Sequence, residues 1–90
     1  MATGKAQVKI QSYSYRVVVE EDAFPDGTKA YHAYVPALRG CRRWGYTLEE
    51  ALKNVQEAAE VWIEDALKHD EPIPEEKPKE GPIITVNVPE

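Results

Sequence analysis

A long amphipathic segment from Thr47 to Asp70 constrains the fold more than any other part of the chain. Its apolar residues recur at steps of three and four, which places them on one stripe of a helix. Thr47 and Glu50 match the Thr-x-x-Glu capping box that begins a helix, and Pro72 disfavours helix at the preceding residue, so we expect the helix to stop near Asp70. Such a helix must pack its stripe against a second layer. The stripe contains Leu48, Ala51, Leu52, Val55, Ala59, Trp62, Ala66 and Leu67.

Three strands are predicted before this helix, over residues 8–20, 29–35 and 41–46. In the first, apolar and polar residues alternate with the period of two that indicates a sheet with one buried face. Residues 21–28 contain Pro-Asp-Gly and predict a turn, so the first two strands should form a hairpin. The third strand is short and is expected at an edge. The alternating apolar residues are Tyr13, Tyr15, Val17 and Val19 in the first strand, and Tyr31, Ala33 and Val35 in the second.

A proline-rich connection over residues 71–82 follows the helix, and residues 83–88 predict a final strand. The order β-β-β-α-β defines an α+β fold, with a mostly antiparallel sheet and one long helix on one face. Because a long crossover joins the third and last strands, the last strand is expected to run parallel to the first, in the sheet order 3-2-1-4. We expect residues 1–90 to form a single domain, with residues 1–7 flexible and residues 71–82 extended.

The charge and composition exclude several classes of function. Eleven basic and sixteen acidic residues give a net charge of −5, which argues against a nucleic acid as the main ligand. No apolar run approaches the roughly 20 residues of a membrane span, and the start lacks the apolar stretch of a signal peptide. Cys41 is the only cysteine and is interpreted as a small buried hydrophobic residue. The chain is therefore expected to be soluble, cytoplasmic and free of membrane contact.

No catalytic motif is recognised, and no catalytic, metal-binding or cofactor-binding residue is predicted. Acidic residues gather at Glu20, Glu21, Asp22 and Asp26, where they are interpreted as hydrating a turn. His32 is expected on the outer face of the sheet, and His69 complements the negative end of the helix dipole. Two distant histidines and one cysteine do not have zinc-site spacing.

The basic and aromatic residues of the predicted third strand are candidates for a partner interface. Arg42, Arg43 and Trp44, preceded by Arg39, could contact phosphates or an acidic partner surface, with Trp44 as an anchor. The same arginines could instead protect an edge strand from unwanted pairing, and the sequence supports both interpretations equally. Trp62 is assigned to the core, although Val61 and Ile63 beside it widen the apolar surface, which suggests that the helix end meets another subunit.

Several short motifs follow one another along the middle of the chain. A Val-Pro-x-Leu-x-Gly-Cys turn occupies residues 35–41, and a Gly-x-Thr-x-Glu-Glu-Ala helix start occupies residues 45–51. An Ala-x-x-x-Trp pattern follows in the helix. The order and spacing of these motifs resemble the HicB-like antitoxin family, over roughly residues 13–74. Tyr46 departs from the family, in which most members carry aspartate at that position.

This resemblance implies a ribonuclease H-like fold without catalytic carboxylates, and a role in binding and neutralising a HicA-like toxin, which is a small basic ribonuclease that cleaves messenger RNA. It also implies a homo-oligomer, as a dimer or tetramer. Many relatives continue into a DNA-binding domain, whereas only two residues follow Val88 here, so direct DNA binding is not expected. On the outer helix face, the candidate toxin contacts are Glu57, Glu60 and Glu64.

Two other functions stay open at the level of sequence. One is a metal-dependent nuclease that retains ribonuclease H-like activity through Glu20, Asp22 and Asp26. The other is an oligomeric scaffold that binds a small ligand between subunits, which would require convergent polar groups at the interface.

Overall fold

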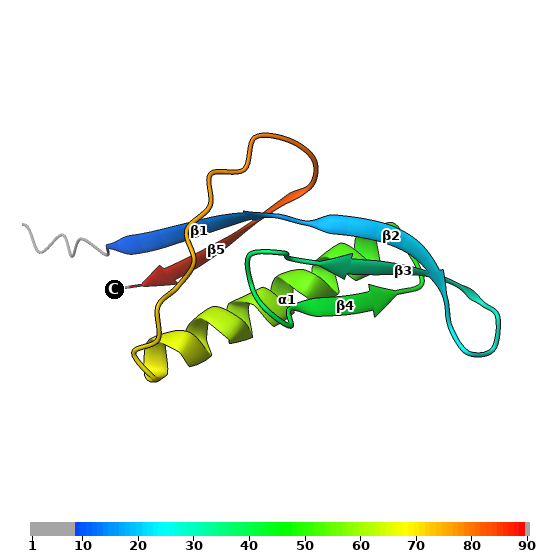
Figure 1. Cartoon of the computed structure of the whole chain (residues 1–90), viewed down its shortest axis with the longest axis horizontal. Helices are drawn as coiled ribbons and strands as arrows, with labels where there is room; N and C mark the ends of the chain where they lie inside the picture. The colour runs from blue at the N-terminus through cyan, green and yellow to red at the C-terminus, as the bar shows by residue number, and fades with distance from the viewer. Residues whose placement is uncertain (1–8, 90) are drawn as a thin grey trace, which may run out of the picture.

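The computed structural model describes residues 9–89 and has an α+β architecture, as predicted (Figure 1). All strand pairs are antiparallel, and one helix packs on both sheets. The prediction for residues 1–7 lies outside the described residues, and the ribonuclease H-like description stays a prediction. The elements are β1 (Ile10–Arg16), β2 (Val18–Ala23), β3 (Lys29–Tyr34), β4 (Arg42–Gly45), α1 (Leu48–Lys68) and β5 (Ile83–Pro89).

The predicted first strand is divided at Val17 into β1 and β2, and each half belongs to a different sheet. β2 pairs with β3 and β3 with β4, whereas β1 pairs with β5. Every neighbour in the predicted order 3-2-1-4 is therefore found. The apolar alternation is confirmed, since Tyr15 and Val17 are buried, and Tyr13 and Val19 are half-buried against the core.

The hairpin turn is shorter than predicted. Residues 21–23 lie in β2, opposite residues 29–31, and not in the turn. The turn closes between Phe24 and Thr28, whose backbone N–H and carbonyl oxygen are separated by 2.9 Å between nitrogen and oxygen. Gly27 adopts a φ of 87°, a conformation that glycine adopts without steric cost. The Pro-Asp-Gly residues therefore form a compact turn, and the first of the two strands extends further toward this turn than was predicted.

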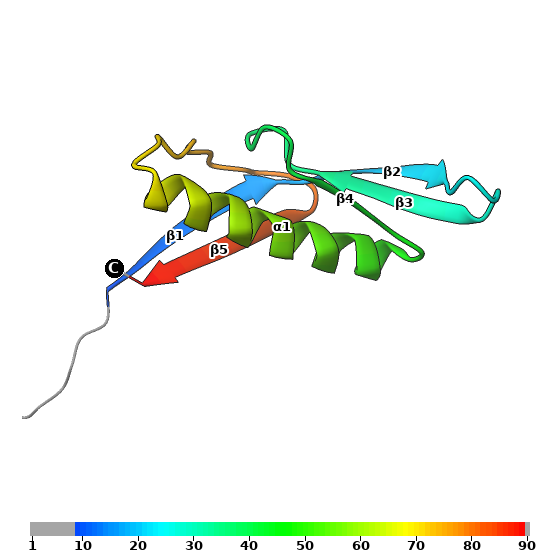
Figure 2. The same ribbon diagram turned by 90° about the horizontal axis from the view of Figure 1, so that it is seen from below.

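The predicted parallel direction of the last strand is wrong, because β5 runs antiparallel to β1 from Ile83, opposite Arg16, to Pro89, opposite Ile10. The helix ends beside the start of β1, as Figures 1 and 2 show, and the connection then returns the chain to the other end of that strand. Residues 69–82 are long enough for this return, since an extended chain advances about 3.1 Å per residue. The right-handed crossover rule concerns parallel strands and so does not apply.

The helix begins and ends as predicted. The Thr47 hydroxyl accepts a hydrogen bond from the N–H of Glu50, at 3.0 Å, and the carboxylate of Glu50 accepts one from the N–H of Tyr46, at 3.1 Å. The reciprocal bond therefore reaches one residue further back than in the usual capping box. His69 is the C-cap, and Asp70 has a φ of 51°, which turns the chain out of the helix.

The core lies between α1 and both sheets. Val55, Ala59 and Ile63 are fully buried on the helix, whereas Leu48 and Leu67 from the predicted stripe are exposed. The predicted stripe identifies the buried face of the helix correctly. Ile63, which was not included in the stripe, is fully buried there, whereas Trp62 is only partly buried. Further buried residues are Tyr15, Val17, Ala33, Val35, Leu38, Cys41, Ala51, Ala58, Ile84 and Val86.

Trp62 and Cys41 show how the turn after β3 is joined to the helix. The indole of Trp62 is only partly buried, and its Nε1–H donates to the carbonyl oxygen of Arg39, at 2.9 Å. Cys41 is buried as predicted, with Sγ 4.0 Å from the carbonyl oxygen of Val55, and burial raises the pKa of its thiol. Both residues therefore have structural roles. Within residues 9–89, no helix is long and apolar enough to span a membrane.

Candidate protein-interaction site

The outer face of the β2-β3-β4 sheet carries a cluster of aromatic and acidic side chains. Strand alternation places these side chains on the face opposite Ala33, which is buried in the core. The register brings them together, because His32 lies opposite residue 20 on one side and residue 44 on the other. We call this cluster the aromatic–acidic patch; it consists of Glu20, Asp22, His32 and Trp44.

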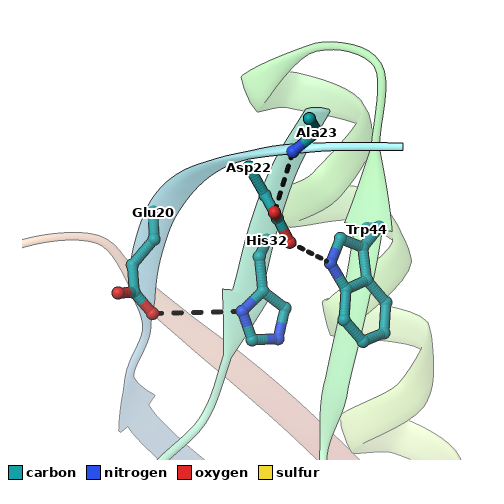
Figure 3. A network of polar contacts seen from close by, with 5 residues as sticks. All are labelled: Glu20, Asp22, Ala23, His32 and Trp44. Carbon is teal, nitrogen blue, oxygen red and sulfur yellow. Dashed lines mark hydrogen bonds and ion pairs between the residues drawn. The ribbon is translucent and has the colours of Figure 1, made fainter. Parts of the chain in front are cut away.

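Trp44 is held in one orientation by two contacts (Figure 3). Its ring stacks on the imidazole of His32, with centroids 4.5 Å apart and an interplanar angle of 16°. Its Nε1–H donates to Oδ2 of Asp22, at 3.0 Å, while Oδ1 of Asp22 accepts from the N–H of Ala23, at 2.8 Å. Trp44 nevertheless stays 40% exposed. The indole is therefore both ordered and accessible.

The small side chain of Ala30 makes this arrangement possible. Trp44 lies on β4 and Asp22 on β2, so their hydrogen bond passes across the intervening strand β3. Asp22 lies directly opposite Ala30, which is fully buried although it shares the outer face by alternation. A methyl group at this position leaves room for the indole to reach the carboxylate.

The electrostatics of the patch are acidic on the β2 side. The N–H of Ala23 and the indole N–H of Trp44 hold the pKa of Asp22 below its ordinary value, because both bonds favour the charged carboxylate. Oε1 of Glu20 lies 3.9 Å from Nδ1 of His32. The side chain of His32 is only 14% exposed, and its buried Nε2 has no hydrogen-bond partner within residues 9–89. The outer-face position of His32 is as predicted, but its burial was not.

The predicted interface residues Arg42, Arg43 and Trp44 all lie exposed on β4. The Val35 N–H donates to the carbonyl oxygen of Cys41, so alternation leaves the backbone groups of Arg42 and Trp44 facing away from β3. Side chains occupy both outward carbonyl oxygens: Nη1 of Arg43 donates to that of Arg42, at 2.6 Å, and Nδ2 of Asn54 donates to that of Trp44, at 2.9 Å. The protected-edge interpretation thus gains structural support for Arg43.

The predicted helix contacts Glu57, Glu60 and Glu64 are all exposed, and their spacing of three and four residues places them along one face of α1. Glu57 lines a groove of about 280 Å³ together with Arg43. Glu60 and Glu64 line a second groove of about 270 Å³, beside β5. Along this face, Glu57 therefore adjoins the β4 edge, whereas Glu60 and Glu64 adjoin β5.

The acidic residues of the nuclease alternative do not converge. Asp26 accepts a hydrogen bond from the N–H of Thr28 within the hairpin turn, at 2.9 Å. Glu20 and Asp22 lie instead on β2, outside this turn. In the part of the chain that the structure describes, no three His, Cys, Asp or Glu side chains are grouped to hold a metal ion. A further groove of about 390 Å³ lies between β1 and residues 74–78.

The sequence analysis missed the grouping of Asp22 and His32 with Trp44. The missing information was the hairpin register, because a turn over residues 21–28 leaves Asp22 outside the strand. If the turn had been confined to Phe24–Thr28, pairing the residues before Phe24 with those after Thr28, one by one, would have placed Glu20 opposite His32.

Comparison with known proteins gives one family and several relatives. Residues 15–84 match a family described as "HicB_like antitoxin of bacterial toxin-antitoxin system". A UPF0150 protein of Synechocystis sp. is 42% identical over 66 residues, which cover 73% of this chain and 78% of the relative. A UPF0150 protein of Thermoplasma acidophilum is 42% identical over 73 residues, which cover 81% and 96% respectively. No solved structure matches significantly.

Proposed function

This chain belongs to the HicB-like antitoxin family, and we propose that it binds and neutralises a small basic toxin of the HicA-like kind, which cleaves messenger RNA. The observation that carries the proposal is the extent of the family match, which runs from β1 into β5 and so includes the helix and the aromatic–acidic patch. In this role the chain is a binding protein and has no catalytic step of its own.

The charge of the chain supports a basic protein as the partner. The net charge of −5 favours encounter with a positively charged surface, and an RNA-cleaving toxin needs such a surface to hold phosphates. An acidic protein that covers this surface would exclude RNA from it. Neutralisation then requires only tight binding, without chemical change in either protein.

We also propose that the chain assembles with itself. Val61 is 63% exposed on the helix, beside the groove that Arg43 and Glu57 line. In this proposal, a second copy of the chain packs over Val61 and the groove. A dimer or tetramer would present several copies of the aromatic–acidic patch to toxin molecules. Sedimentation equilibrium tests this, and a monomer at all concentrations would contradict it.

The proposal predicts that a short basic protein is encoded beside this chain, and its test is co-expression of the two proteins in a bacterial host. The basic protein alone should stop growth and cleave messenger RNA, and this chain should restore growth. The purified pair should form a stable complex that no longer cleaves a synthetic RNA. Continued cleavage in the presence of excess chain would refute the proposed function.

A further inference from the structure

We propose that the aromatic–acidic patch is a receptor for one arginine side chain of the basic protein partner, whose guanidinium stacks on the exposed part of Trp44 and pairs with the carboxylate of Asp22, while Glu20 adds a second negative charge to the patch. This inference rests on the proposed function, since it specifies how a basic toxin would be recognised. It assigns the recognition to the sheet and not to the helix glutamates.

The state of Trp44 is the first argument. A large apolar ring that stays 40% exposed on a sheet face gains little from folding, yet two directed contacts fix its orientation. His32 stacks on one face of the ring (Figure 3), so a partner would reach Trp44 through its other face or its edges, which carry the 40% exposure. Tryptophan is enriched among the residues that dominate protein interfaces, and a side chain that is already held in place loses less conformational entropy when a partner binds.

The carboxylates beside the ring are the second argument. Asp22 receives one hydrogen bond on each oxygen, and each carboxylate oxygen has a further lone pair that can accept a bond from a ligand. Glu20 lies two residues away on the same face of β2, and its side chain is 59% exposed. A cation over the indole would therefore gain the attraction of the ring and of the adjoining Asp22 carboxylate, whereas Glu20, beyond His32, would contribute through its longer-range charge.

Within residues 9–89, no lysine or arginine forms an ion pair with Asp22 or Glu20. Lys29 is engaged by Glu21, with 2.9 Å between Nζ and Oε1. Arg42 shares the outer face with Trp44, but it lies opposite Tyr34, on the side of Trp44 away from Asp22. On this face the acidic residues therefore lie on β2, whereas the cation Arg42 lies on β4.

Arginine fits this geometry better than lysine. A guanidinium is planar, so it can lie flat on the indole while its edge donates two parallel hydrogen bonds to a carboxylate. An ammonium group is a compact and strongly hydrated charge that does not stack in this way. The patch is therefore expected to distinguish the two cations, whereas a diffuse acidic surface would not.

The experiment uses the full chain labelled with ¹⁵N and two peptide probes, acetyl-Gly-Arg-Gly-Arg-Gly-amide and its lysine counterpart. The indole N–H resonance of Trp44 is the reporter, and that of Trp62, which is bonded to Arg39, is the internal reference. The arginine peptide should shift the Trp44 resonance selectively and bind more tightly than the lysine peptide. Equal shifts of both indoles, or none, would overturn the inference.

Paired charge-removing variants test the carboxylates. Glu20→Gln with Asp22→Asn should weaken binding of the arginine peptide by about tenfold or more, which corresponds to roughly 1.4 kcal/mol. Glu60→Gln with Glu64→Gln removes the same charge from the exposed helix face and should change the affinity little. Thermal unfolding confirms that each variant is folded. Equal weakening by both pairs would reduce the effect to net charge and overturn the inference.

Co-expression with the toxin separates this inference from the proposed function. If the unmodified chain restores growth and the Glu20→Gln/Asp22→Asn variant does not, both stand. If both restore growth equally, the function stands and the receptor is refuted. If neither does but the arginine peptide still selects Trp44, the patch binds arginine as proposed and the antitoxin function fails.

Discussion

The hydroxyl of Tyr15 donates a hydrogen bond to the carbonyl oxygen of Pro74, at 2.6 Å, and so joins β1 to the connection that follows the helix. The N–H of Arg16 continues this attachment by donating to the carboxylate of Glu76, also at 2.6 Å. These bonds fix the path of the returning connection, and that path determines that β5 enters antiparallel to β1. A sequence-distant contact thus supports the feature of the fold that was predicted wrongly.

Replacing Tyr15 with phenylalanine should lower the free energy of unfolding by about 1 kcal/mol, the usual contribution of one partly buried hydrogen bond. The ring would keep its packing in the core, where Tyr15 is fully buried. Urea unfolding at neutral pH measures the change. Tyr34→Phe is the matched control, since no hydrogen bond of its hydroxyl occurs within residues 9–89, and it should be nearly neutral.

Tyr15→Phe should also change how the free energy of unfolding depends on pH in the alkaline range. Burial raises the pKa of Tyr15 to about 12, above the value of about 10 expected in the unfolded chain. Because the folded pKa is raised, the contribution of Tyr15 is complete below about pH 10 and is lost as the pH rises through about 12. Between these values the natural chain should lose stability relative to Tyr15→Phe, and a constant difference in unfolding free energy would contradict this.

Gly45 is expected to be intolerant of any side chain. A Cβ atom at this position would lie 2.5 Å from the backbone nitrogen of Ala51 and 2.9 Å from the backbone carbon of Glu50, so β4 would have to move away from the helix. Gly45→Ala should therefore destabilise the fold by about 1–3 kcal/mol, as other overpacked sites do. Gly27→Asn is the control, because its Cβ meets open space and asparagine tolerates positive φ. Thermal unfolding compares the two.

Trp44→Phe should raise the pKa of Asp22 toward its ordinary value without restoring it fully. The phenyl ring keeps the stack on His32 but cannot donate to the carboxylate, while the N–H of Ala23 still can. Titration of the Asp22 carboxyl carbon by NMR measures this shift. Because the folded pKa is lowered, the stability supplied by Asp22 is present above the unfolded pKa and is lost as the pH falls from there through the folded pKa; in the variant this loss should be smaller and should be complete at a higher pH.

The sequence predicted the local elements well because their signals are local. The capping residues Thr47 and Glu50 and the period of the apolar residues place the helix without knowledge of anything beyond it. Burial of Tyr15 and Val17 follows in the same way from alternation within one strand. The neighbours of each strand were also predicted correctly, because a hairpin and a short edge strand leave few alternative ways to pair the strands.

The direction of β5 and the grouping of the patch depend on information that is not local. β5 could run either way until the path of residues 69–82 is known, and that path is set by contacts such as Tyr15 with Pro74. Trp44 reaches Asp22 only because the hairpin register places Ala30 between them. A displacement of one residue would point Asp22 to the other face of the sheet.

The free edge of β4 offers a final prediction. Arg43 and Asn54 donate to the outward carbonyl oxygens of Arg42 and Trp44, so this edge presents few acceptors to another strand. The double variant Arg43→Ala with Asn54→Ala should release both acceptors and remove a charge from the edge, which favours pairing between chains. Sedimentation velocity should then show more association than in the natural chain. Lys53→Ala, which removes one positive charge and leaves the β4 edge intact, should not; equal association in this variant would exclude edge protection as the cause.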